Sequence, residues 1–267
     1  MISIVMSYYN RKDLFHLTLK SITKSKFKDV EVIAVDDGSL PEHRIEDFVE
    51  EFPFLKVVRV EPEDKWYINC CIPFNMAIRE AMGDIIVLQN PECLHANDVL
   101  TYLSENVNES NYISVSTYGL DSKHVSQGVL GYGLKTDSLS DLLKSLPQVP
   151  YRGNRAMGWY NHSKFRPEAW HFCSAMTREN MAKLNGFDER YATGVACDDS
   201  EFIIRIKKLG LKVVITEDVS VIHQYHESSC SLPNEHKLWE KNQQILRDIT
   251  MTESNPYVNQ IKLWPGN

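Results

Sequence analysis

Short apolar runs and segments of helical periodicity alternate through the first hundred residues. The strand-like runs lie at 2–6, 30–35, 55–60 and 84–88. Between them, apolar residues recur at the three- and four-residue spacing of a helix that buries one face, as at Phe15, Leu19 and Ile22. This alternation predicts an α/β fold with a mostly parallel, Rossmann-like sheet, helices on both faces and right-handed crossovers.

The periodicity weakens after residue 118 and returns near residue 171. Residues 119–165 are rich in glycine and serine and contain an aromatic-basic cluster, so we interpret them as a long loop that covers or lines a site. A strand, a helix to about residue 184, a helix over 199–209 and a C-terminal amphipathic helix follow. Two more apolar segments, at 212–215 and 219–222, are expected to close the sheet. We therefore predict a single domain over residues 1–267.

Charge and cysteine usage limit the setting in which the chain works. A net charge of −7 argues against bulk binding to nucleic acid or to an anionic membrane, because both require a basic face. No apolar run approaches the roughly 20 residues of a membrane span, and the apolar start is too short for a signal peptide. The six cysteines include no C-x-x-C pair, which argues against a finger-type zinc site and indicates reduced thiols. We expect a cytoplasmic protein, with peripheral attachment to a membrane as an alternative.

Polar side chains follow three of the four predicted strands at the point where each strand ends. The three segments are Ser7-Tyr8-Tyr9-Asn10-Arg11, Asp36-Asp37-Gly38-Ser39 and Gln89-Asn90-Pro91-Glu92. Ligands of open parallel sheets bind beyond these carboxyl ends, so we expect the segments to line one cleft. The chain contains neither G-x-G-x-x-G nor G-x-x-x-x-G-K-[ST], which argues against a dinucleotide or P-loop site. A nucleotide in this cleft would be held by side chains and a metal ion.

The acidic pair Asp36 and Asp37 has two interpretations that the local sequence supports about equally. Asp-Asp-Gly-Ser is a good turn sequence in its own right, because aspartate side chains bond to nearby backbone and glycine accepts positive φ. Alternatively, one carboxylate accepts a hydrogen bond from the imide N–H of uracil or an equivalent base.

A carboxylate and two histidines are candidate metal ligands. Glu92 follows the fourth strand, and His223 and His226 end a late strand. Carboxylate oxygens suit hard divalent cations, and imidazole suits Mn²⁺ and its neighbours. In extended chain, residues three apart point to opposite faces, so we expect only one of the two histidines to be a ligand.

Two adjacent acids, Asp198 and Asp199, stand where a helix is expected to begin, and Glu201 follows them. One interpretation is a helix cap, since caps favour aspartate and serine and the helix dipole favours acids at this end. The other is catalytic, because a positioned and partly desolvated carboxylate can act as a general base. Both apply if Asp198 caps the helix and Asp199 is the base.

Two tryptophans lie in an aromatic and basic part of the chain. Trp159 belongs to Gly158-Trp159-Tyr160-Asn161-His162, and Trp170 precedes His171. Such residues can recognise an acceptor or a sugar, because indole faces stack on sugar C–H surfaces. Alternatively, both tryptophans are packing residues whose N–H groups find partners, as buried tryptophans usually do.

Five motifs, in order along the chain, resemble those of the family 2 glycosyltransferases with the GT-A fold. They are the opening strand and loop at 4–11, the Asp-Asp-Gly-Ser motif at 36–39, the segment 74–84, the Gly-Phe-Asp-Glu turn at 185–190 and Asp198-Asp199. Asn185 stands where that turn usually has its first glycine, and Asp198-Asp199 falls where the family has Glu-Asp. The resemblance extends from Ser3 to about His226.

The resemblance implies a role for each part of the chain. Residues 1–118 would bind the nucleotide sugar, residues 119–230 would bind the acceptor and catalyse, and residues 231–267 would form a C-terminal helix and tail. The residues implied to hold the nucleotide sugar are Ser7, Tyr9, Arg11, Asp37, Asn75 and Asn90. The implied metal ligands are Glu92, His223 and His226. Those implied to contact the acceptor or the sugar are Trp159, His171 and Asp198, with Asp199 as the general base.

The chain departs from the family pattern at its metal motif. Gln89-Asn90-Pro91-Glu92 stands where the family has Asp-x-Asp, so only one carboxylate remains. Glu92 fits best as the ligand of a divalent cation, Mn²⁺ or Mg²⁺, with Asn90 near the ribose or the phosphates. Some relatives carry a similar Asn-Pro-Glu.

The resulting hypothesis is an inverting, metal-dependent transfer from a nucleotide diphosphate sugar, a UDP-sugar above others, to a glycan, lipid-linked or protein hydroxyl. The reduced Asp-x-Asp motif motivates an alternative, a non-catalytic relative that binds a nucleotide sugar or a glycan. The intact Asp198-Asp199 pair weighs against it. A nucleotidyltransferase would require a glycine-rich basic loop after the first strand, and 7–11 is not such a loop.

Overall fold

The computed structural model of the chain describes residues 1–120, 139–152, 157–227, 234–252, 258–259 and 262–264. Part of the long segment 119–165 that was expected to cover or line a site therefore lies outside the described residues, as does Cys230. Within that segment the structure has a helix, α6 (Leu139–Ser145), and a strand, β7 (Gly158–Asn161), so it is not a loop throughout.

The first four predicted strands are all present and form one parallel half-sheet. They are β1 (Ile2–Tyr8), β2 (Val30–Asp37), β3 (Leu55–Val60) and β4 (Ile85–Gln89). Their order is β3-β2-β1-β4, and each neighbouring pair runs parallel. The carboxyl ends of all four strands therefore meet at one edge, as the strand-end argument requires.

The sheet continues beyond β4 in the order β8-β6-β9-β5, with β7 paired to β6. The added strands are β5 (Cys93–His95), β6 (Asn111–Gly119), β8 (Cys173–Thr177) and β9 (Lys212–His223). β6 and β9 are parallel and form the longest run of paired residues in the sheet. β8, β5 and β7 pair antiparallel to their neighbours. The result is one α/β domain with a mostly parallel sheet and some antiparallel pairs.

The two closing segments expected at 212–215 and 219–222 are one strand, β9, with a register shift opposite Val115 and Ser116.

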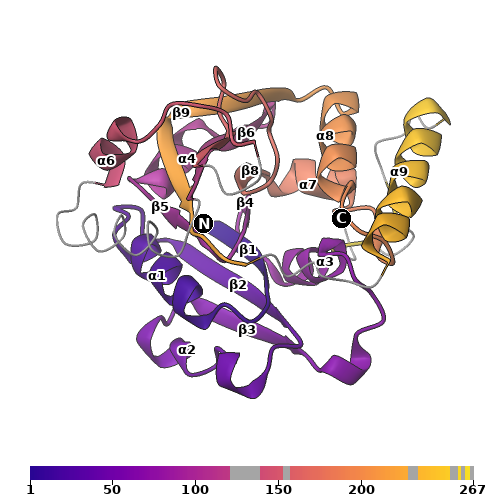
Figure 1. Cartoon of the computed structure of the whole chain (residues 1–267). Helices are drawn as coiled ribbons and strands as arrows, with labels where there is room; N and C mark the ends of the chain where they lie inside the picture. Colours follow the sequence, from indigo (N-terminus) through magenta and orange to yellow (C-terminus); the bar gives the residue numbers. More distant parts are fainter. Residues whose placement is uncertain (121–138, 153–156, 228–233, 253–257, 260–261, 265–267) are drawn as a thin grey trace.

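Helices cover both faces of the sheet, as predicted. One face carries α1 (Lys12–Thr23), α2 (Phe48–Glu51) and α4 (Val99–Asn106). The other carries α3 (Cys71–Glu80), α7 (Arg178–Leu184), α8 (Asp198–Lys208) and α9 (Glu235–Thr252). Figure 1 shows α1 and α2 on one side of the molecule, with α8 beside α9 on the other.

The alternation of side chains along β1 explains why two cores form. Ile4 and Met6 pack with Phe15 of α1, whereas Val5, between them, packs with Phe74 of α3 and Phe202 of α8. Successive residues of a strand point to opposite faces, so a nearly continuous apolar run feeds both cores.

The second predicted helix is much shorter than its periodicity indicated. Among the residues around Ile45 and Phe52, only Phe48–Glu51 is helical, preceded by a 3₁₀ turn at Pro41–His43. Pro53 follows Phe52, and a residue before proline is pushed out of the helical region. Phe52 accordingly has φ −124° and ψ 83°. Two more 3₁₀ turns lie at Pro62–Asp64 and Glu189–Tyr191.

Among the described residues, no helix combines the length and apolar character needed to cross a membrane. The five cysteines within the described part of the chain are all free thiols.

Candidate active site

A cavity of about 770 Å³ opens at the carboxyl ends of the parallel strands. Nine of the residues to which the resemblance assigns a role line it: Ser7, Tyr9, Arg11, Asp37, Asn90, Glu92, His171, Asp198 and Asp199. They come from the ends of β1, β2 and β4, from the segment before β8, and from the start of α8. The expectation that the strand ends share one cleft is therefore confirmed. Asn75 and Trp159 lie elsewhere, and His223 and His226 lie against Glu92.

Asp36 and Asp37 lie in different surroundings. Asp36 is fully buried, its Oδ1 accepts a hydrogen bond from the backbone N–H of Ser39 at 2.9 Å, and its Oδ2 lies 3.1 Å from Arg59 Nη2. It therefore holds the turn. Asp37 faces the cavity, where Lys65 Nζ donates to its Oδ2 and Tyr67 Oη donates to its Oδ1, both at 2.7 Å.

The electrostatic setting of Asp37 combines burial with two strong donors. Burial raises the pKa of Asp37, and the hydrogen bonds from Lys65 and Tyr67 offset only part of that increase. Lys65 Nζ also lies 5.1 Å from the centre of the Tyr9 ring, so the cation and an aromatic face border the same carboxylate.

Lys65 and Tyr67 were not identified from the sequence, although a signal was available. They follow β3, and the carboxyl end of β3 lies at the same edge as those of β1, β2 and β4. Lys65 and Tyr67 stand five and seven residues beyond the end of β3 at Val60, so the pattern of polar residues directly after each strand does not include them.

Glu92 is the most heavily paired acid of the site. It is 2% exposed, its Oε2 accepts from Arg11 Nη1 at 2.9 Å, and its Oε1 lies 3.1 Å from His223 Nε2 and 3.3 Å from His226 Nε2. Burial alone would raise the pKa of Glu92, but hydrogen bonds from the two imidazoles and the charge of Arg11 hold that pKa well below its ordinary value. The carboxylate therefore stays ionised.

The prediction that His223 and His226 point to opposite faces was wrong. It assumed that the chain stays extended through both residues, but β9 ends at His223 and His226 lies beyond it. Both Nε2 atoms consequently reach one oxygen of Glu92, and one ligand atom from each of the three residues lies within 4.8 Å of the others.

The donor set of Glu92, His223 and His226 fits a divalent cation of the manganese type. One carboxylate and two imidazoles converge from one side, and Mn²⁺ accepts both oxygen and nitrogen ligands. Glu92 lines the cavity, so a cation held there could share its remaining coordination positions with a ligand in the cavity.

The start of α8 presents the second group of acids. Cys197, in a left-handed conformation with φ 72°, occupies the N-cap position of α8, and its side chain makes no capping hydrogen bond. Asp198 is the first residue of the helix and therefore not the cap that the sequence indicated. Asp198 Oδ1 instead accepts from Asn69 Nδ2 at 2.9 Å. Glu201 is buried and accepts from Arg205 Nε at 2.6 Å, so the third acid is structural.

Asp199 is the second acid at the start of α8. It lines the cavity, and its Oδ1 accepts from the backbone N–H of Ser200 at 2.7 Å. Burial raises the pKa of Asp199 to about 7, with the neighbouring charge of Asp198 adding to the shift. A carboxylate that titrates near neutral pH takes up a proton far more readily than one with an ordinary pKa.

Asn75, which the resemblance placed at the nucleotide, is a structural residue. It is fully buried in α3, donates from Nδ2 to Phe187 O at 2.9 Å and to Glu189 Oε1 at 3.0 Å, and accepts at Oδ1 from Phe187 N at 2.8 Å. It therefore holds the Gly-Phe-Asp-Glu turn. That turn needs Gly186, because its φ is +75° and a Cβ there would lie 2.4 Å from Asn75 Oδ1.

Of the two tryptophans, the structure places only Trp170 at the cavity. Trp159 is 5% exposed, packs edge-on against Tyr118, and donates from Nε1 to Gln148 Oε1 at 3.1 Å. The packing interpretation therefore holds for Trp159. Trp170 lines the cavity with the Arg166 guanidinium 4.6 Å from the centre of its ring.

The family model described as "Glycosyl transferase family 2" matches residues 3–175, well over half of the chain. The chain is 22% identical over 276 aligned residues to the "Uncharacterized glycosyltransferase YfnE" of Bacillus subtilis (strain 168). That alignment covers 85% of this chain and 66% of the relative, so the chain spans slightly less than two thirds of that protein's length.

Two solved structures share the fold at low sequence identity. The S. aureus TarS 1-349 structure in complex with UDP-GlcNAc superposes with a TM-score of 0.62 at 14% identity, over 94% of this chain and 66% of that chain. The mannosyltransferase PcManGT from Pyrobaculum calidifontis, in complex with GDP-Man and Mn²⁺, superposes with a TM-score of 0.55 at 18% identity, over 85% and 58% of the two chains.

Proposed function

The chain belongs to glycosyl transferase family 2, and from that premise we propose that it transfers a sugar from a nucleotide diphosphate sugar to a hydroxyl acceptor with inversion at the anomeric carbon. One observation carries the proposal. A single cavity contains a carboxylate suited to a nucleobase, Asp37, a paired and ionised metal-type carboxylate, Glu92, and an acid that titrates near neutral pH, Asp199.

The donor that this cavity favours is a UDP-sugar. Asp37 can accept the imide N–H of uracil, while Lys65 Nζ, 2.7 Å from the same carboxylate, can donate to a neighbouring carbonyl of the base. Guanine has a second N–H beside its imide, so with Lys65 and Tyr67 already bonded the carboxylate would have to accept two further hydrogen bonds, whereas uracil requires only one. The Tyr9 ring can stack on the base. The complexes of UDP-GlcNAc with TarS and of GDP-Man with PcManGT show that the fold accepts both bases.

Glu92, His223 and His226 would hold the divalent cation, Mn²⁺ or Mg²⁺. When bound, that cation would take up negative charge on the departing diphosphate. Arg11 contributes a fixed positive charge on the cavity side of Glu92. Asn90, from the same loop, lines the cavity where the ribose or phosphates of the donor would lie.

Asp199 would remove the proton from the acceptor hydroxyl. The acceptor oxygen then bonds to the anomeric carbon from the face opposite the diphosphate, and the bond from that carbon to the diphosphate oxygen breaks. The proton stays on the Asp199 carboxylate, and the electron pair of the broken bond leaves with the diphosphate. Trp170 and His171, which line the same cavity, are well placed to contact the acceptor or the transferred sugar.

A glycan, a lipid-linked sugar and a protein hydroxyl are all compatible acceptors, and the reduced thiols support a cytoplasmic setting. The division of the domain into a nucleotide-sugar part at 1–118 and an acceptor part at 119–230 also belongs to the proposal. β6, β8 and β9 of the same sheet bring the two parts into contact.

The alternative is a non-catalytic relative that binds a nucleotide sugar or a glycan, which the single carboxylate of the segment 89–92 favours. Incubation of the purified chain with UDP-GlcNAc and other UDP-sugars, with Mn²⁺, separates the two. The enzyme should release UDP, and Asp199→Asn should slow that release when an acceptor is present by about 10²–10⁴-fold while it leaves donor affinity unchanged. An Asp199→Asn variant that transfers sugar at the parental rate would refute the assignment of the base.

A further inference from the structure

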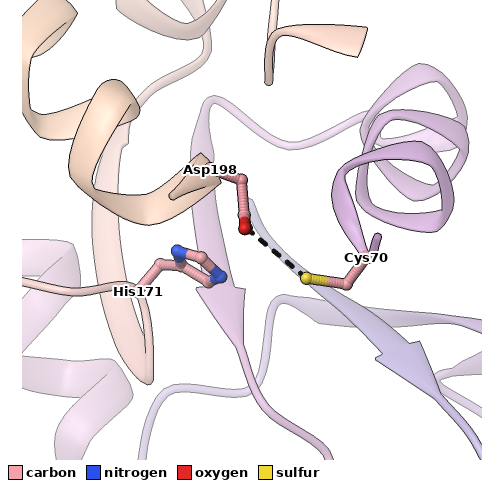
Figure 2. A group of neighbouring side chains, drawn as sticks. All are labelled: Cys70, His171 and Asp198. Carbon is pink, nitrogen blue, oxygen red and sulfur yellow. Dashed lines mark hydrogen bonds between the residues drawn. The ribbon is translucent and has the colours of Figure 1, made fainter. Parts of the chain in front are cut away.

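A second group of metal-type side chains lies in the cavity, apart from Glu92. Cys70 precedes the first turn of α3, His171 lies just before β8, and Asp198 is the first residue of α8. One possible ligand atom from each residue lies within 4.8 Å of the other two. Figure 2 shows the thiol, the imidazole and the carboxylate directed toward one another. All three residues line the cavity.

The His171 imidazole is held in place without the hydrogen bonds that such a ring normally makes. It is 9% exposed, and the rings of Phe74 and Phe187 lie edge-on to it at 5.1 and 5.0 Å between centroids. Its Nδ1 is buried without a hydrogen-bond partner, and no hydrogen bond joins either ring nitrogen to another described residue. A buried polar group with no partner is costly, so an oriented histidine of this kind indicates that a ligand completes it.

The Asp198 carboxylate is oriented so that one oxygen remains for a ligand. Asn69 Nδ2 holds Oδ1 at 2.9 Å, while Oδ2 faces the Cys70 thiol, which donates to it over 3.5 Å. An amide that fixes one oxygen of a carboxylate is the usual arrangement around metal ligands, because it sets the direction of the other oxygen.

We propose that Cys70, His171 and Asp198 form a zinc-binding site in the wall of the cavity, distinct from the Glu92, His223 and His226 group. Zn²⁺ binds thiolate, imidazole and carboxylate together, whereas Mn²⁺ and Mg²⁺ do not favour sulfur. Three protein ligands with the fourth position open to the cavity match the coordination of solvent-accessible zinc sites. On binding, the Cys70 thiol releases its proton to solvent and bonds as thiolate.

The geometry needs only small adjustments to accept the ion. Ligand atoms at about 2.0–2.3 Å from tetrahedral zinc stand roughly 3.5 Å from one another. The present upper limit of 4.8 Å therefore requires shifts of about 1 Å, within the reach of side-chain rotation at Cys70 and Asp198. Bound zinc would occupy space beside Asp199 and engage Asp198, so it would inhibit the proposed sugar transfer. That last consequence rests on the proposed function, whereas the binding itself does not.

Cobalt titration tests the site directly, because Co²⁺ replaces Zn²⁺ and gives a charge-transfer absorption only when thiolate is a ligand. Chelator-treated wild-type protein should bind Co²⁺ with that absorption, and Zn²⁺ should displace it. Glu92→Gln should keep the absorption, since it affects only the other group. Cys70→Ser should abolish it, while Cys71→Ser, a change in the neighbouring buried thiol, should retain it.

Absence of the thiolate absorption in the wild type, or its persistence in Cys70→Ser, would overturn the proposal. If circular dichroism shows that Cys70→Ser does not fold, alkylation of the wild type decides instead. Zn²⁺ should slow modification of Cys70 by iodoacetamide at least tenfold, as measured by peptide mass spectrometry, and an unchanged rate contradicts the site. Because none of these measurements uses a sugar donor, they stand even if the proposed transferase activity fails.

Discussion

Asn75 binds Phe187 through both ends of its side-chain amide, accepting from Phe187 N at 2.8 Å and donating to Phe187 O at 2.9 Å. The two residues are far apart in sequence, and the pair connects α3 to the turn that precedes α8. Phe187 in turn stacks on Phe202 of α8 with the ring centroids 4.5 Å apart, so the contact supports the helix that begins with Asp198 and Asp199.

Asn75→Ala should therefore destabilise the fold without weakening donor binding. Two buried backbone groups of Phe187 lose their partner, which should lower the free energy of unfolding by about 1–3 kcal/mol for each group left unsatisfied. Chemical denaturation measures this loss, and calorimetric titration with UDP measures the affinity. If UDP affinity falls while stability is unchanged, Asn75 contacts the nucleotide after all.

The parts of the fold that the sequence predicted best are those governed by local periodicity. β1 to β4 and α1 were found because their apolar residues repeat with the period of the element. β5 and β6 were not predicted. β6 is buried along its whole length, although Ser114, Ser116 and Thr117 interrupt its apolar residues, and β5 has only three residues. The short α2 was overestimated because proline ended a periodic segment.

The site was predicted where chain connectivity determines position and missed where packing does. Asp37 ends β2 and Glu92 follows β4, two parallel strands on either side of β1, so topology alone brings them to one edge. Asn75 and Trp159 were misassigned because a residue's motif does not tell which way its side chain points in a packed fold. His226 depended on where β9 ends, which the sequence did not reveal.

Asp199 should make the protein less stable as the pH rises. Its pKa is about 7 in the folded chain and about 3.9 when unfolded, so between these values the folded state binds more protons. Stability from this group is complete below about pH 4 and is lost as the pH rises through 7. Asp199→Asn stays neutral and avoids the loss. Its Tm should exceed that of the wild type at pH 8 and approach it at pH 4, by about 2–4 °C for each kcal/mol recovered. Equal melting temperatures at pH 8 would mean that the carboxylate is not buried as described.

Lys65→Met should weaken UDP binding and reduce the preference for UDP over GDP. Lys65 is the donor beside Asp37, and its loss removes a charge-assisted hydrogen bond worth about 1.5–3 kcal/mol, equivalent to about tenfold or more in Kd. Calorimetric titration with UDP and GDP measures both quantities. Lys56→Met provides a control, because Lys56 pairs with Glu80 on the surface and should leave both affinities unchanged. An unchanged ratio of UDP to GDP affinity would exclude Lys65 from base recognition.

The two tryptophans should respond in opposite ways. Trp170→Ala removes an aromatic face from the cavity and should raise the KM for the acceptor about 2- to 10-fold with little change in Tm. Trp159→Phe loses the hydrogen bond to Gln148 and some packing, so it should lower the free energy of unfolding by about 1–3 kcal/mol and leave KM unaltered. A raised KM in Trp159→Phe would restore its predicted role in acceptor recognition.

His223 and His226 share one oxygen of Glu92, and we expect both to bind the cation. His223 and His226 approach Oε1 at 3.1 and 3.3 Å, so neither is favoured by geometry as the single ligand. His223→Gln and His226→Gln should each reduce Mn²⁺ affinity, by about 10- to 100-fold as typical of a disturbed metal site. The double variant and Glu92→Gln should abolish measurable binding.

Mn²⁺ affinity can be followed by electron paramagnetic resonance of the free ion, and UDP affinity by calorimetry with Mn²⁺ or with EDTA. In the wild type, EDTA should weaken UDP binding. In Glu92→Gln, UDP should bind equally with and without Mn²⁺, because the cation no longer reaches the diphosphate. His95→Gln is the matched control: His95 is also buried near the end of β4, but its Nε2 pairs with Gln89 at 3.0 Å and not with Glu92.

If only one histidine variant loses Mn²⁺ affinity, the other imidazole serves to orient Glu92, and the site has one carboxylate and one nitrogen ligand. If neither variant does, the cation is not held at Glu92, and charge on the diphosphate must be met by Arg11 alone among the groups that contact this carboxylate.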